Sequence, residues 1–203
     1  MCQNFAQSII TFILSYSISI YLIRRNETYD WWNATFIISF CSIQLWEAII
    51  YLEPKYNEYM TLLILITLYI QPTCQLLWYC FHVRKFSYIS FGFMFWLLLF
   101  IGRMNNIDSL SSEKGIGGSL IWKDGNKNFF FHENKFSLII YGICISLPTL
   151  YQEKKGDLLF LTGCITLISS VIKGYYYYNT FFHPELGSLW CYSANIYSII
   201  TML

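Results

Sequence analysis

The side chains best suited to chemistry in this sequence are a few polar residues inside long apolar segments. Glu47 lies within the apolar segment 31–52, and Gln44 precedes it by three residues, so a helix would place both on one face. Ionisable groups in apolar spans are costly and are functional candidates by default. A carboxyl group beside an amide can bind a proton or a small cation, or it can form a structural ion pair.

Three further amides lie in other apolar segments. Gln71 and Gln75 are four residues apart, with Pro72 between them opening the local helical backbone, and Asn195 lies near the end of the chain. Two interpretations remain open for these amides. They line an internal polar path with Gln44 and Glu47, or they join helices through hydrogen bonds worth about 1 kcal/mol or less each.

A second candidate group contains Cys2, His183 and Cys191, which the expected helix directions place at the same end of the molecule as Glu47 and Lys173. Thiols, an imidazole and a carboxylate can bind a transition metal. Cys2 and Cys191 can instead form a disulfide if the outer side of the membrane is oxidising, with their Cα atoms within about 7 Å. In the third alternative, Cys2, His183 and Cys191 are independent side chains. Lys173 is a candidate ion-pair partner. The sequence does not identify a cofactor.

The composition indicates an integral membrane protein. Of the 203 residues, 56% are apolar and 12% are charged, about half the charged fraction of a usual soluble domain. The net charge is +1 and no basic run is dense, so a nucleic-acid partner is not expected. The lipid bilayer is the expected partner, with other membrane subunits or self-association as further possibilities.

The apolar residues fall into seven blocks that approach the roughly 20 residues of a spanning helix. The blocks are 5–23, 31–52, 59–80, 86–102, 136–151, 158–172 and 186–203. The fifth and sixth are short, so six spans is the alternative. The blocks lack the alternation of a membrane β-barrel. The sequence therefore predicts an all-α, multi-pass transmembrane bundle that forms one domain over residues 1–203.

Basic residues predict the orientation of this bundle. Pairs of them follow the first, third and fifth blocks: Arg24 and Arg25, Arg84 and Lys85, and Lys154 and Lys155. Because cytoplasmic connections are enriched in Lys and Arg, we expect the N-terminus outside and the C-terminus in the cytosol. The glycosylation sequon that begins at Asn26 would then face the cytosol.

The one sizeable loop, residues 103–135, is expected on the outer side. Asp124-Gly125 lies between two β-prone runs, which favours a short hairpin. Gly115, Gly117 and Gly118 precede it, but no predicted strand precedes them and no predicted helix follows, as a phosphate-binding loop requires. We therefore expect a hairpin over the bundle rather than a nucleotide site.

Several classes of membrane protein are excluded by the residues they need. A retinal protein needs a lysine in its last span, and the block 186–203 has none. An intramembrane hydrolase of the ceramidase type needs several buried His and Asp residues, and a haem protein needs paired histidines within spans. No predicted span holds such residues in its interior.

Short motifs in a fixed order resemble those of an uncharacterised family of small multi-span membrane proteins found in large DNA viruses, protists and bacteria. The motifs are Met1-Cys2, Arg24-Arg25, Ile43-Gln44-x-x-Glu47, Gln71-Pro72 and Gly187-Ser188-Leu189-Trp190-Cys191. Members of that family typically begin Met-Cys-Phe-Ser, whereas Gln3-Asn4 follows Cys2 here. The resemblance covers the first three blocks and the last one. It implies membrane residence and singles out these residues, but it implies no activity.

Three functions are compatible with these observations. A transporter or channel for a small solute or ion would use Glu47 as its ion- or proton-binding group. A structural or assembly subunit of a membrane complex would use its many aromatic residues against partner helices. A metal-dependent intramembrane enzyme would use the Cys, His and Glu group. We rank them in that order, with an enzyme the least favoured.

Overall fold

The computed structural model describes residues 4–83, 86–125, 127–128, 135–153, 155–179, 185, 188 and 195–202. This part of the chain is mostly helical. Its α-helices are α1 (Phe5–Arg25), α2 (Asp30–Leu52), α3 (Asn57–Val83), α4 (Phe86–Met104), α5 (Lys135–Ser146), α6 (Gly156–Tyr178) and α8 (Asn195–Met202). Two 3-10 turns, Pro54–Tyr56 and Leu147–Tyr151, precede α3 and follow α5.

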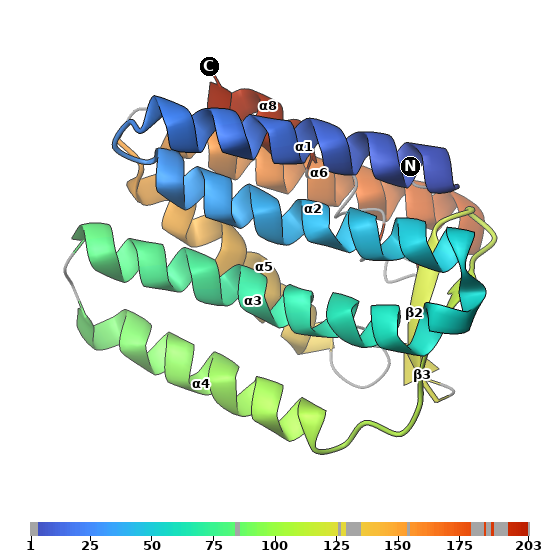
Figure 1. The fold of residues 1–203 in the computed structure, drawn as a ribbon. Helices are drawn as coiled ribbons and strands as arrows, with labels where there is room; N and C mark the ends of the chain where they lie inside the picture. Colours follow the sequence, from blue (N-terminus) through green and yellow to red (C-terminus); the bar gives the residue numbers. More distant parts are fainter. Residues whose placement is uncertain are drawn as a thin grey trace.

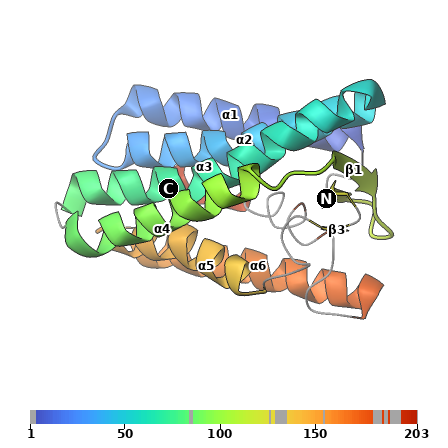
Figure 2. The same ribbon diagram turned by 90° about the horizontal axis from the view of Figure 1, so that it is seen from below.

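The helices form a bundle of two layers. Helices α1 to α4 lie side by side in chain order, as Figure 1 shows, and α2 packs against both α1 and α3. Helices α5, α6 and α8 lie behind them, and Figure 2 shows α5 and α6 on the opposite side from α1 and α2. Helix α8 contacts α1, α2 and α6, so the C-terminal residues close the bundle against its first helices.

Four helical segments are long and apolar enough to cross a membrane by length and composition, among the residues that the structure describes: Phe5–Arg25, Asp30–Leu52, Pro54–His82 and Gly156–Tyr178. The sixth predicted block, 158–172, is thus a full-length helix of 23 residues rather than a short one. The fifth is shorter, because α5 has 12 residues and gives way to a 3-10 turn that contains Pro148. Seven spans are not established by these helices.

A small antiparallel sheet lies at one end of the bundle, with the strand order β1 (Leu110–Lys114), β2 (Leu120–Asp124) and β3 (Lys127–Asn128). Strands β2 and β3 pair Asp124 with Lys127 across the turn at Gly125, which has a φ of 60°. The first strand was not predicted from the sequence. It is attached to α3 through Asn57, whose side chain bonds to the backbone N–H and C=O of Ser112.

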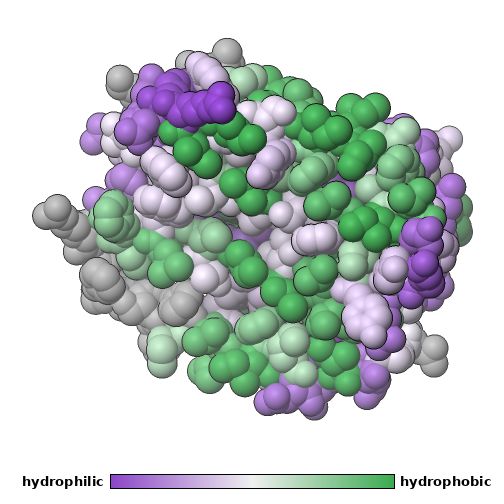
Figure 3. All heavy atoms as spheres, viewed as in Figure 1, coloured by the Kyte–Doolittle hydropathy of each residue, from purple (hydrophilic) through white to green (hydrophobic). Residues whose placement is uncertain are grey.

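The faces of the helices reverse the pattern of a soluble protein. The buried face of α6 carries Thr162, Thr166 and Ser170, whereas its exposed residues include Leu161, Ile165, Ile168 and Ile172. Helix α1 likewise buries Ser8, Ser15 and Ser19 and exposes Ile10, Ile13, Leu14 and Ile20. In Figure 3, apolar side chains spread across the middle of the visible face and hydrophilic ones gather towards its edges. A surface helix in water would present the opposite faces.

Candidate functional site

Glu47 is completely buried near the sheet end of α2. The Ser188 hydroxyl donates a hydrogen bond of 2.6 Å to Glu47 Oε1. Glu47 Oε2 has no hydrogen-bond partner among the described residues. Ser188 therefore satisfies one carboxyl oxygen, and the second oxygen depends on weaker contacts.

The Trp122 side chain of β2 lies close enough to the Glu47 carboxyl group to interact with it. The indole Nε1 is buried and has no hydrogen-bond partner within the described part of the chain. On the preceding turn of α2, the Gln44 amide oxygen lies 3.4 Å from the hydroxyl of Thr11, which donates to it. Glu47 and Gln44 thus lie next to polar side chains of α1, β2 and Ser188. We take these residues as the candidate site.

The other amides of the predicted path lie elsewhere along the bundle and join helices. The Gln71 amide nitrogen donates to the Ser39 carbonyl over 3.2 Å, and Gln71 Oε1 accepts a hydrogen bond from the hydroxyl of Tyr141. Gln75 Oε1 accepts from the indole of Trp32. Since Ser39 precedes Glu47 by eight residues, these bonds lie about 12 Å or more from it along the helix axis.

Asn195 also makes a contact between helices. Its side-chain oxygen accepts a hydrogen bond of 2.6 Å from the Ser15 hydroxyl, which joins the start of α8 to α1. The five polar residues of the predicted path are therefore spread along the bundle. Only Gln44 and Glu47 share a site, since they occupy the same face of α2.

Another buried carboxyl group, Glu185, was not singled out from the sequence. Its oxygens accept hydrogen bonds from the backbone N–H groups of Gly117 (2.7 Å) and Ser119 (3.0 Å), and from the hydroxyl of Tyr178. The Ile116 N–H donates to the same Tyr178 hydroxyl over 3.0 Å. The glycine-rich loop between β1 and β2 thus surrounds an anionic group, as backbone N–H nests do. That group belongs to the chain itself.

Lys173 has Glu185 as its electrostatic partner among the described residues. It interacts electrostatically with the Glu185 carboxyl group, although the two form no ion pair within 4 Å among the described residues. The Lys173 ammonium lies over the Tyr177 ring, 5.9 Å from its centroid.

The predicted group of Cys2, His183 and Cys191 lies outside the described residues. The separation of the two thiols and their proximity to Glu47 remain predictions. In the part of the chain that is described, no three His, Cys, Asp or Glu side chains gather in a way that would hold a metal ion.

No family model, curated protein or solved structure matches the chain. The features of the chain that bear on its function are the apolar outer faces of the helices and the buried site around Glu47.

Proposed function

We propose that this chain is a multi-pass integral membrane protein that moves a proton, a small ion or a solute across the bilayer through Glu47. The reversed helix faces support the membrane location, because hydroxyl side chains are buried where they can hydrogen-bond and Ile and Leu side chains meet the surroundings. A helix of 23 residues such as α2 is about 35 Å long, enough for a hydrocarbon core of about 30 Å. We retain seven spans as the proposed number.

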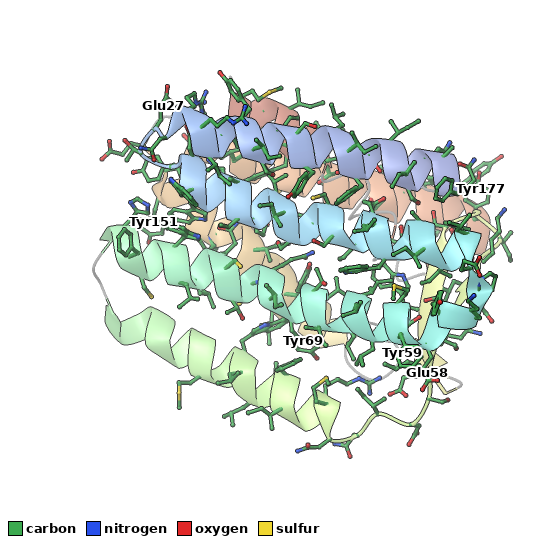
Figure 4. The ribbon with its side chains drawn as sticks, viewed as in Figure 1. Glu27, Glu58, Tyr59, Tyr69, Tyr151 and Tyr177 are labelled. Atoms are coloured by element: carbon green, nitrogen blue, oxygen red, sulfur yellow. The ribbon has the colours of Figure 1, made fainter. Side chains whose placement is uncertain are left out.

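We propose that these outer faces contact lipid. The exposed positions of α6 carry the large aliphatic side chains Leu161, Ile165, Ile168 and Ile172. Helices that pack on one another in membranes use small residues at their contacts. This face of α6 therefore supports the transporter over a subunit whose surface is covered by partner helices. The tyrosines labelled in Figure 4 near the bundle ends, Tyr151, Tyr59 and Tyr177, suit the two interfaces of a membrane.

The single observation that supports transport is the partly satisfied Glu47 carboxyl group. An ionisable side chain in a membrane span is expensive and marks ion pathways and proton relays. Ser188 satisfies one oxygen, and the other makes no hydrogen bond within 3.5 Å to the described residues, although the Trp122 side chain interacts with the group. Glu47 would bind the proton or cation, and Gln44 and Trp122 would supply neighbouring polar groups.

Glu47→Gln is expected to reduce this transport at least tenfold, because an amide keeps the size and the Ser188 contact but cannot take up a proton or neutralise a cation. The measurement is flux into liposomes that contain the purified protein, under an imposed pH gradient or membrane potential, for protons, Na⁺, K⁺ and a panel of small solutes. Glu58→Gln is the matched control, since Glu58 is exposed in the first turn of α3 at the same end of the bundle. Absence of flux for every tested species, or equal flux in Glu47→Gln and the unchanged protein, would contradict the proposal.

The proposed orientation, with the N-terminus outside, makes a separate prediction at Asn26. Expressed in a eukaryotic secretory membrane, the protein should carry no glycan there, because the turn between α1 and α2 would face the cytosol. The measurement is the change in gel mobility after endoglycosidase treatment. As a control, Asn128→Thr creates a sequon that begins at Asn126, in the loop proposed to lie outside, and this sequon should be modified. A glycan at Asn26, with none in the control, would reverse the orientation.

A further inference from the structure

A polar cleft of about 350 Å³ lies at the end of the bundle opposite the sheet. It is formed where the turn between α1 and α2 meets the turn before α6. Its lining is Arg25, Asn26, Glu27, Thr28, Tyr29, Asp30, Asn33, Gln152, Glu153 and Lys155. The volume lies within the range of small-molecule sites, about 300–1,000 Å³.

Two buried amides lie in the lining of the cleft. Asn33 donates to the Gln152 side-chain oxygen over 3.1 Å, and Gln152 donates back to the Asn33 oxygen over 3.0 Å. The Tyr197 hydroxyl also donates to the Asn33 oxygen, over 3.1 Å. Both amides are almost completely buried. Because each amide nitrogen carries two protons, each has one N–H that donates to no described residue.

The two cations of the lining differ in how fully they are used. Arg25 forms a two-pronged ion pair with Asp30, with N···O distances of 2.8 and 2.6 Å, and also donates to the carbonyl oxygens of Thr201 and Met202. Lys155 donates to the Thr201 carbonyl oxygen over 3.1 Å. That is its one hydrogen bond to the described residues, and an ammonium has three donors. Lys155 can therefore bind an anionic group in the cleft.

The cleft also carries acidic side chains, which can bind a positively charged group of a ligand. Among the described residues of the lining, two are cations, Arg25 and Lys155, and three are acids, Glu27, Asp30 and Glu153. The Arg25 guanidinium pairs with Asp30, and Lys155 also interacts electrostatically with the Asp30 carboxylate. Glu27 reaches the Arg25 guanidinium only at 3.7 Å, and its side chain is mostly exposed. Glu153 forms no ion pair with any described residue and can hold a ligand ammonium.

We propose that this cleft binds a small zwitterion, a molecule that carries a primary ammonium and an anionic group a few bonds apart. Lys155 and the spare amide donors hold the anionic group, and Glu153 and Glu27 hold the ammonium. The same chemistry occurs in free amino acids and aminophosphates and in the headgroup of phosphatidylethanolamine. The cleft lies about 25 Å from Glu47 along α2, since 17 residues separate Asp30 from Glu47. It is therefore a site independent of the proposed transport step.

The test uses the full chain in nanodiscs of phosphatidylglycerol, a lipid without an amine. Calorimetric titration compares glycine and ethanolamine phosphate with the two halves of the zwitterion, ethanolamine and inorganic phosphate. At least one zwitterion should bind at least tenfold more tightly than either half. A second arm uses nanodiscs that also contain phosphatidylethanolamine, with native mass spectrometry to detect a retained lipid. Retention of this lipid, lost in Lys155→Gln, would assign the site to the headgroup.

Lys155→Gln and Glu153→Gln should each weaken binding at least tenfold. Lys55→Gln and Glu58→Gln are matched controls at the other end of the bundle and should bind as the unchanged protein does. Glu47→Gln should also bind normally, which separates this result from the transport assay. Absence of saturable binding in both arms would overturn the proposal. So would binding that is no tighter for the zwitterions than for phosphate, or that persists unchanged in Lys155→Gln and Glu153→Gln.

Discussion

Gly115→Ala is expected to lower the free energy of unfolding by about 3 kcal/mol, because the new methyl group would enter the space of the Glu185 carboxylate. A Cβ atom at position 115 would overlap Glu185 Oε1 and lie 2.6 Å from the Tyr178 hydroxyl oxygen. The Glu185 side chain cannot move away freely, since it accepts backbone hydrogen bonds from Gly117 and Ser119. Any shift would leave buried N–H groups without an acceptor. The measurement is unfolding of the purified protein in mixed detergent–SDS micelles.

Gly102→Ala is the matched control for this substitution. A Cβ atom at Gly102 meets no atom of the described residues within 4 Å, and alanine is favoured over glycine within a helix by about 1 kcal/mol. This variant should therefore be as stable as the unchanged protein or slightly more so. If Gly115→Ala were equally tolerated, the Glu185 carboxylate would not be held by the glycine-rich loop as described.

The ranges of the first four helices could be predicted because apolar length alone defines them. The predicted blocks 5–23 and 31–52 differ from α1 and α2 by one or two residues at the ends. The end of α6 was predicted too early, at residue 172. Lys173 and the tyrosines that follow it interrupt the apolar run, although they continue the helix to Tyr178. Polar and aromatic residues at a membrane boundary remain compatible with helix, so hydropathy marks the boundary and not the helix end.

Strand β1 could not be predicted because its sequence, Leu-Ser-Ser-Glu-Lys, has little β propensity. Its alternating burial comes from Leu110 and Ser112, and the Ser112 backbone is held by the Asn57 side chain from α3. That contact joins residues 55 positions apart. Local sequence carries no signal for it.

Glu47 and Gln44 could be singled out from the sequence because polar residues stand out in an apolar span. Glu185 could not, since it lies next to Pro184 in a segment with other turn-forming residues. The available signal was the glycine-rich loop 115–118, which can bind an anion through its backbone N–H groups. A phosphate is one such anion. A carboxylate from a distant part of the same chain is another, and no local pattern indicates it.

Arg25→Met is expected to lower the free energy of unfolding by about 3–5 kcal/mol, the usual cost of leaving one member of a buried ion pair without its partner. Asp30 is almost completely buried, and its oxygens accept from the Arg25 guanidinium and from the Glu27 backbone N–H. The substitution also removes the donors that reach the carbonyl oxygens of Thr201 and Met202 at the end of α8. Unfolding in mixed detergent–SDS micelles gives the value.

The double variant Arg25→Met/Asp30→Leu should recover part of this loss, because it leaves no buried charge unpaired and replaces the pair with apolar groups. It should still be less stable than the unchanged protein, since the α8 carbonyl groups remain without the Arg25 donors. Lys55→Met is the surface control: Lys55 pairs with Glu53 at 3.3 Å, but both side chains are at least half exposed. Removing such a pair changes stability by about 1 kcal/mol or less. Additive losses in Arg25→Met, Asp30→Leu and the double variant would show that the pair contributes no coupling. In that case α8 would be held at this end of the bundle by Lys155 and its packing against α1, α2 and α6.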